Sequence, residues 1–75
     1  MNRRPVSSTN IASMGWEASE DDPSDGTLEV AFKSGHIYQY ANVSEATYQA
    51  LLGASSVGKS MNSMIIGRYT EQRVD

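Results

Sequence analysis

The chain has 75 residues, a net charge of −3 at pH 7 and an isoelectric point of about 4.9. This length predicts one domain, and the acidic balance argues against duplex DNA as a partner, because DNA binding relies on Lys and Arg to neutralise phosphates. The absence of cysteine and the single histidine, His36, exclude disulfides, thiolate metal sites and a histidine metal cluster, and no apolar run approaches the roughly 18 residues of a membrane span.

The two ends of the chain, residues 1–5 and 70–75, are expected to be flexible. Four of the six basic residues lie near these ends: Arg3, Arg4, Arg68 and Arg73. They could form a basic patch if the ends meet in space, or remain separate solvated charges. No apolar signal-peptide segment follows the first residues, so we expect a cytoplasmic protein.

A first strand is predicted over Ile11–Trp16, with Ile11 on the face opposite to Met14 and Trp16. Met14 and Trp16 either complete the core or belong to an edge strand that pairs with a second chain. The next segment, Ala18–Gly26, contains three aspartates with one proline and one glycine, and predicts an acidic loop. Its carboxylate spacing does not fit an EF-hand, so no metal site is expected.

Two further strands, Thr27–Lys33 and Ile37–Ala41, alternate between apolar and polar residues and predict a hairpin. The connection fits a type I turn followed by Gly35 in the left-handed conformation, which is a G1 bulge. A tighter turn at residues 34–35 is the alternative, but Asn-Gly or Asp-Gly is its usual sequence.

The turn decides which way two tyrosines point. The bulge places Tyr38 opposite Val30 and Tyr40 opposite Leu28, on the apolar face of the hairpin. The tighter turn would shift the register by one residue and turn both rings to the other face. We favour the bulge, because the polar residue between the tyrosines then faces solvent.

The first predicted helix begins after the N-cap Ser44 and ends at Leu52, where Gly53 stops it. Tyr48 and Leu51 belong to an apolar stripe along this helix that would lie on the sheet.

A second, shorter helix is predicted to start at Ser55 or Ser56 and to run towards Ile66, before Gly67. The sequence thus predicts an α+β fold in a single domain over residues 1–75. A small three-stranded antiparallel sheet would be packed by one main helix and a shorter second helix.

The segment Gly53–Ser60 reads GASSVGKS and matches the P-loop pattern GxxxxGK[ST]. A working P-loop joins a buried strand to a helix, whereas here a predicted helix precedes the match. The chain is also too short for a parallel sheet with crossover helices. We therefore expect no nucleotide hydrolysis and, because no nucleophile elbow surrounds any serine, no other enzyme activity.

Several short motifs share their order and spacing with a known family. They include Asn10–Trp16, the Tyr38 and Tyr40 pair, and Gly58-Lys59 followed by Asn62 and Arg68-Tyr69. Across Val6–Val74 they resemble the KTSC domain, a small bacterial and phage module also found at the C-terminus of some lysyl-tRNA synthetases. The resemblance implies RNA binding and a protein of a bacterial cell or a phage-infected host. Met61 departs from the aromatic residue usual at its position in the family.

Five residues are candidates for a ligand site. Lys59, Asn62 and Arg68 could receive a phosphate or carboxylate, unless they are solvated positions of a short helix. Tyr38 and Tyr40 could stack on bases, or pack beneath the main helix. The expected function is a small non-enzymatic module, without cofactor, that binds RNA or a nucleotide-type phosphate ligand.

The alternative function is a protein-interaction module. Examples are a phage-encoded inhibitor of a host defence protein, or a protein that sequesters a nucleotide signal. A 75-residue domain without disulfides has little core to stabilise it, so assembly into a homo-oligomer is a further expectation.

Overall fold

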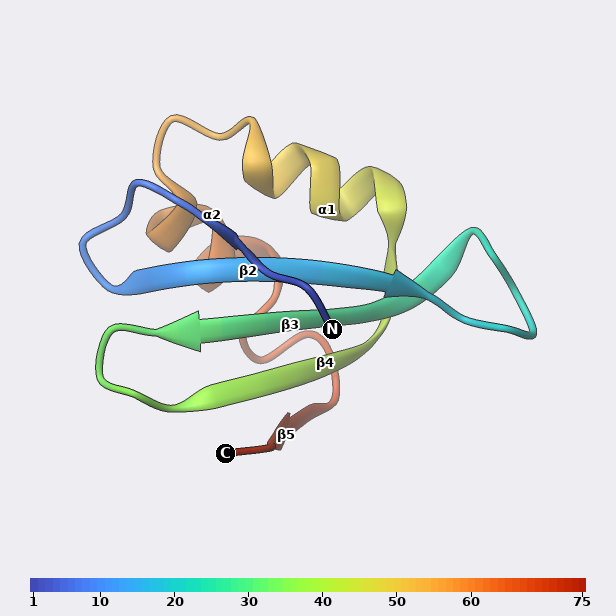
Figure 1. Cartoon of the computed structure of the whole chain (residues 1–75). Helices are drawn as coiled ribbons and strands as arrows, with labels where there is room; N and C mark the ends of the chain where they lie inside the picture. Colours follow the sequence, from blue (N-terminus) through green and yellow to red (C-terminus); the bar gives the residue numbers. More distant parts are fainter.

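The computed structural model describes all of residues 1–75. Five antiparallel strands form one sheet in the order β1-β2-β3-β4-β5, and both helices pack on the same face of it (Figure 1). The predicted α+β class is confirmed. In chain order the elements are β1 (Arg4–Pro5), β2 (Ile11–Ala18), β3 (Asp25–Phe32), β4 (Ile37–Ser44), α1 (Glu45–Leu52), α2 (Val57–Met64) and β5 (Glu71–Arg73).

The prediction of three strands is wrong, because each end of the chain adds a short edge strand. Arg4 and Pro5 pair with β2, and Glu71–Arg73 pairs with β4. Segments of two and three residues are too short to show an alternation of apolar and polar residues, so their extended conformation depends on pairing with a neighbouring strand. Flexibility of the end segments stays a prediction.

The hairpin between β3 and β4 has the predicted register. Tyr38 lies opposite Val30 and Tyr40 opposite Leu28. Gly35 adopts a φ of 102° and donates its N–H to the Phe32 carbonyl at 3.0 Å, as a type I turn with a G1 bulge requires. Glycine suits this position because a side chain would be strained there.

The predicted alternation in the first strand is wrong at one position. Ile11 pairs with Phe32 and Ser13 pairs with Ala31, so Ala12 is an extra residue that forms a bulge. The bulge turns Ile11 to the same face as Met14, where it is 1% exposed. Burial of a large aliphatic side chain outweighs the regular alternation here.

A second bulge lies in β4, where Asn42 has a φ of 62° between Tyr40 and Val43. Asn tolerates this left-handed conformation better than a β-branched residue does. We expect Asn42→Val to lower the free energy of unfolding by roughly 1–2 kcal/mol and Asn42→Gly to leave it nearly unchanged. Urea unfolding of both variants tests this, and equal midpoints would show that the bulge relaxes freely.

The core lies between the sheet and the two helices. Met14, for which the sequence left both the core and contact with a second chain open, is 0% exposed, and Met61 is 1% exposed. The core is therefore built within one chain, while self-association stays a prediction. Its members are Ile11, Met14, Leu28, Val30, Tyr40, Val43, Tyr48, Leu51, Val57, Met61 and Ile65.

Both helices begin where the sequence predicts. The Ser44 hydroxyl accepts a hydrogen bond from the Thr47 N–H at 3.1 Å, and Ser56 caps α2 in the same way. Gly53 is the residue that ends α1. The second helix stops at Met64, two residues before its predicted end, and Gly67 follows with a φ of 82°.

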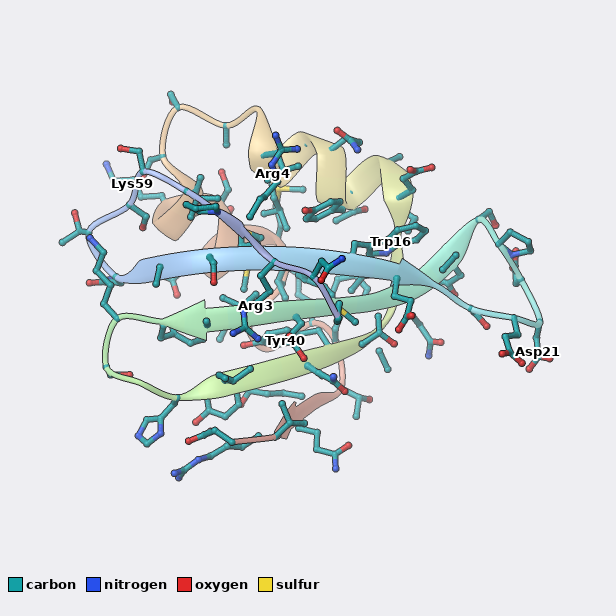
Figure 2. The ribbon with its side chains drawn as sticks, in the orientation of Figure 1. Arg3, Arg4, Trp16, Asp21, Tyr40 and Lys59 are labelled. Atoms are coloured by element: carbon teal, nitrogen blue, oxygen red, sulfur yellow. The ribbon has the colours of Figure 1, made fainter.

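The N-terminal segment crosses the sheet on the face opposite to the helices (Figures 1 and 2). Arg3 donates to the Glu29 carboxylate at 2.5 Å and to the Ser13 hydroxyl at 3.1 Å. Gln39 donates to the other Glu29 oxygen at 2.9 Å. Glu29 is 7% exposed, so this face carries a buried carboxylate held by two neighbours.

Candidate functional site

A polar groove runs between the chain that precedes β2 and the start of α2, next to Lys59 in Figure 2. Its volume is about 630 Å³, and two of its side chains, Lys33 and Lys59, are positively charged. We call it the lysine groove. Its lining residues are Ser7, Ser8, Thr9, Asn10, Lys33, Ser55, Ser56, Val57, Gly58, Lys59 and Asn62.

Backbone hydrogen bonds bring the walls of the lysine groove together. The Lys33 N–H donates to the Asn10 carbonyl at 2.8 Å, which fixes the end of the β3–β4 hairpin beside the start of β2. The Ser8 hydroxyl accepts from the amides of Asn10 and Ile11, each at 3.3 Å. A methyl group added to Gly58 would lie 3.6 Å from that hydroxyl, so α2 contacts the same segment.

The first turn of α2 forms one wall of this groove. The Lys59 N–H is bound by the Ser56 hydroxyl at 3.4 Å, and the Ser60 N–H by the Ser56 carbonyl at 3.0 Å. Val57 and Gly58 occupy the first two helical positions, whose amides have no acceptor within a helix. Two ammonium groups, several hydroxyls and the positive end of the α2 dipole make the groove suited to an anion.

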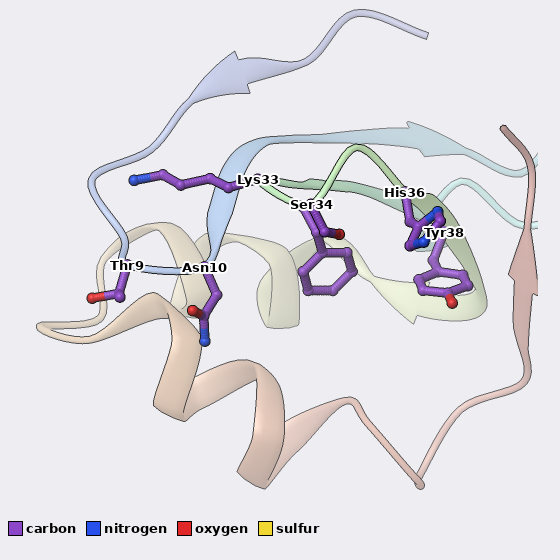
Figure 3. Close-up of a pocket in the computed structure, with 7 residues that line it drawn as sticks. Thr9, Asn10, Lys33, Ser34, His36 and Tyr38 are labelled. Atoms are coloured by element: carbon purple, nitrogen blue, oxygen red, sulfur yellow. The ribbon is translucent and has the colours of Figure 1, made fainter.

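A second, smaller pocket of about 390 Å³ adjoins the lysine groove (Figure 3). The half-buried rings of Phe32 and Tyr38 lie edge to face, with centroids 5.8 Å apart and planes at 71°. We call it the aromatic pocket, and it shares three residues with the lysine groove. Its lining residues are Thr9, Asn10, Phe32, Lys33, Ser34, His36 and Tyr38.

The end of the chain supports one wall of the aromatic pocket. Asp75 contacts His36 Nδ1 at 3.3 Å and accepts hydrogen bonds from the Ile37 N–H and from Arg73 Nε, both at 3.0 Å. The hydrogen bond from Arg73, followed by that from Ile37, holds the pKa of Asp75 well below its ordinary value. The carboxylate thus ties β5 to the start of β4.

The structure separates the three predicted polar residues. Lys59 and Asn62 line the lysine groove together. Arg68 lies beyond the other end of α2, where its Nε donates to the Ser63 carbonyl at 2.7 Å. It is therefore not part of this groove.

The two predicted tyrosines have different environments. Tyr38 is half-buried and lines the aromatic pocket. Tyr40 is 1% exposed, and its hydroxyl donates to Glu71 at 2.8 Å. Burial and this carboxylate raise the pKa of Tyr40. The Tyr40 ring is a core residue and offers no face to a ligand.

Sequence reasoning missed Lys33, Ser8 and Phe32 as members of these pockets. The polar run before the first strand, Ser7–Asn10, was a usable signal. In an antiparallel pair the residues before one strand lie next to the end of its partner, which here is Phe32 and Lys33. The position of α2 over this corner depends on packing in the core and has no local signal.

The basic residues near the two ends do not form one patch, because β1 and β5 lie at opposite edges of the sheet. Arg3 binds Glu29, and Arg73 binds Asp75. Arg4 lines a third groove of about 600 Å³ between the N-terminal segment and the end of α1, which shares Ser7, Ser55 and Val57 with the lysine groove. Lys33 and Lys59 are thus the only cationic side chains of the lysine groove.

The P-loop pattern lies in the context that the sequence predicted. Helix α1 precedes it, Gly53 ends that helix, and only its last residues, Val57–Ser60, belong to α2. No group of three or more His, Cys, Asp or Glu side chains is placed to hold a metal ion. None of the helices has the length and apolar character needed to cross a bilayer.

Comparison with known proteins gives three consistent results. The sequence model of the KTSC domain matches residues 7–69. An uncharacterized protein of Stutzerimonas stutzeri strain A1501 is 38% identical over 76 residues, which cover 100% of both chains. The crystal structure of a KTSC domain protein from Yersinia pestis superposes with a TM-score of 0.83 and 33% identity, covering 99% of this chain and 97% of that one.

Proposed function

Because the chain belongs to the KTSC domain family, we propose that it is a non-enzymatic binding module whose ligand carries phosphate, either RNA or a nucleotide. The observation that carries this proposal is the lysine groove. Lys33 and Lys59 come from distant parts of the sequence and line one polar groove with the first turn of α2. Most other basic side chains are engaged with carboxylates or carbonyls elsewhere.

The alternative, a protein-interaction module acting through a sheet edge, has less support. The two edge strands span only two and three residues, and Pro5 has no N–H to donate to a partner strand. Large exposed apolar side chains are confined to Met1, Ile66 and Val74. The polar, cationic groove therefore favours an anionic ligand over an apolar protein surface.

The proposal predicts that ATP, titrated in magnesium-free buffer, shifts the amide signals of residues 55–62. We expect the double variant Lys33→Gln, Lys59→Gln to bind about 100-fold more weakly, since each charge-assisted hydrogen bond contributes roughly 1.5–3 kcal/mol. Binding should also weaken steeply between low and moderate salt.

The matched control is the double variant Arg4→Gln, Arg68→Gln. It removes the same charge from two exposed arginines outside the groove and should bind ATP nearly as well as the original chain. Equal losses in both double variants would mean that ATP responds only to net charge. Absence of any shift at millimolar ATP, with a protein captured instead, would contradict the proposal.

A further inference from the structure

The aromatic pocket and the lysine groove are one continuous depression, since Thr9, Asn10 and Lys33 line both. Two chemically different compartments therefore meet at a common wall. One offers ring faces, and the other offers ammonium groups, hydroxyls and an amide side chain. A ligand that fills both must have a flat apolar part and an anionic part only a short distance apart.

The rings in the aromatic pocket are placed for contact with a ligand. Phe32 and Tyr38 are half-buried, and the hydrogen bond between Lys33 and Asn10 and the contact of His36 with Asp75 hold the surrounding chain. Figure 3 shows the Lys33 side chain extending towards the side of Thr9 and away from Tyr38, so its ammonium group does not cover the Tyr38 ring. Aromatic side chains in this state stack on unpaired bases of any sequence.

The charge of the lysine groove limits the size of the anionic part. Two ammonium groups match one terminal phosphate, whose charge at pH 7 is about −1.5 to −2. Beyond them, Arg3 and Arg73 are paired with carboxylates, and Arg68 lies past the far end of α2. The adjoining groove adds only Arg4, so no continuous row of cations is available to follow a long nucleic-acid backbone.

We infer that the two compartments form a site for one nucleoside monophosphate unit, with the base against Phe32 and Tyr38 and the terminal phosphate between Lys33 and Lys59. This inference rests on the proposed function and narrows it from phosphate ligands in general to a single nucleotide. The unit could be a free nucleotide or the 5′-phosphorylated end of a single strand, because both present the same chemistry.

The test compares AMP, ribose 5-phosphate and adenosine as ligands of the full chain by calorimetry. We expect AMP to bind about 5- to 100-fold more tightly than ribose 5-phosphate, which is the range that stacking of one base contributes. Adenosine should bind more weakly than AMP. The Tyr38→Leu variant should reduce AMP binding to the level of ribose 5-phosphate and leave ribose 5-phosphate unchanged.

Tyr69→Leu is the matched control, because Tyr69 is also a partly buried tyrosine but lines neither compartment. Tyr38→Phe should retain the preference for AMP, since the ring face remains. Both comparisons require the thermal unfolding of each variant to show a folded protein. The comparison of AMP with ribose 5-phosphate on the unchanged chain needs no variant at all.

The outcomes separate this inference from the proposed function. Equal binding of AMP and ribose 5-phosphate would overturn the base site while the phosphate site stands. No binding of either would overturn both. If a 5′-phosphorylated tetranucleotide binds as tightly as AMP and its unphosphorylated form does not bind, the site also accepts the 5′-phosphorylated end of a single strand. Affinity that grows with strand length without a 5′-phosphate would indicate an RNA track and overturn the single-nucleotide site.

Discussion

Replacing Gly26 with alanine should lower the free energy of unfolding by about 3 kcal/mol or more, since overpacking alone costs about 1–3 kcal/mol and occasionally more. A methyl group at Gly26 would lie 2.2 Å from the Glu17 carbonyl oxygen and 2.8 Å from two ring atoms of Trp16. The first neighbour is backbone on the paired strand and cannot move aside without breaking the sheet. Urea unfolding followed by Trp16 fluorescence measures the loss.

The Trp16 ring cannot give way cheaply either. Its Nε1 donates to the Val43 carbonyl at 2.8 Å, and the ring stacks on Tyr48 with centroids 6.5 Å apart. Moving the ring would sacrifice a hydrogen bond worth about 0.5–1.5 kcal/mol in addition to the clash. The absence of a side chain at Gly26 thus leaves room for the Trp16 ring, which packs between the sheet and helix α1.

Gly53→Ala is the matched control for Gly26→Ala. Gly53 has a φ of −86°, and the nearest atom to an added methyl group is the Gln49 carbonyl oxygen at 3.5 Å. We expect its free energy of unfolding to change by less than about 1 kcal/mol. An unchanged urea midpoint in Gly26→Ala would show that the indole and the neighbouring strand adjust freely, contrary to this prediction.

Removal of the Arg3 side chain is the second change with a large expected effect. Arg3→Met should lower the free energy of unfolding at pH 7 by about 1–3 kcal/mol, because it takes one hydrogen-bonding partner from a buried carboxylate. The Glu29 side chain is only 9% exposed. Gln39 still donates to it at 2.9 Å, which keeps the loss below that of a fully unpaired buried charge.

The effect of Arg3→Met should depend on pH. Burial acts to raise the pKa of Glu29, but hydrogen bonds from Gln39 and Arg3, together with the Arg3 charge, outweigh it and lower the pKa below its ordinary value of 4.5. A lowered pKa in the folded state stabilises the fold above pH 4.5, and this contribution is lost as pH falls below that value. The difference between the original chain and Arg3→Met should therefore shrink from pH 7 to pH 3.

A double-mutant cycle isolates this ion pair. Glu29→Gln removes the negative charge with which Arg3 pairs. Arg3→Met should therefore lower the free energy of unfolding much less in the Glu29→Gln background. Thermal unfolding of the four proteins at pH 7 and pH 3 gives the coupling at each pH. A cost of Arg3→Met that is the same at both pH values and in both backgrounds would show that Arg3 acts by packing alone.

These two sites bear on the proposed ligand site in different ways. The Gly26 and Trp16 contact lies at the end of the sheet near Val43, away from the residues of the lysine groove. Arg3 is paired with the Glu29 carboxylate and does not line the lysine groove. The pairing of Arg3 with Glu29 therefore leaves Lys33 and Lys59 as the cationic side chains of the lysine groove, with Arg4 in the adjoining groove.

Local signals in the sequence determined the central hairpin and both helix starts. The turn residues before Gly35 set the register that places Tyr38 opposite Val30, since a side-chain period of two allows no slip without exposing the apolar face. Ser44 and Ser56 cap their helices because their hydroxyls satisfy amides of the first turn, which is an interaction within three residues. The order of the motifs across Val6–Val74 also identified the family, whose sequence model matches residues 7–69.

Tertiary structure alone decided the edge strands, the Ala12 bulge and the composition of the candidate site. Strands β1 and β5 are too short to show a pattern, and they exist because an edge of the sheet pairs with them. Ile11 turns inward because burial in the core stabilises it more than regular alternation does. Lys33 and Lys59 are 26 residues apart, and no local rule brings them to one groove. Their meeting depends on the packing of α2 against the sheet, which is a long-range property of the folded chain.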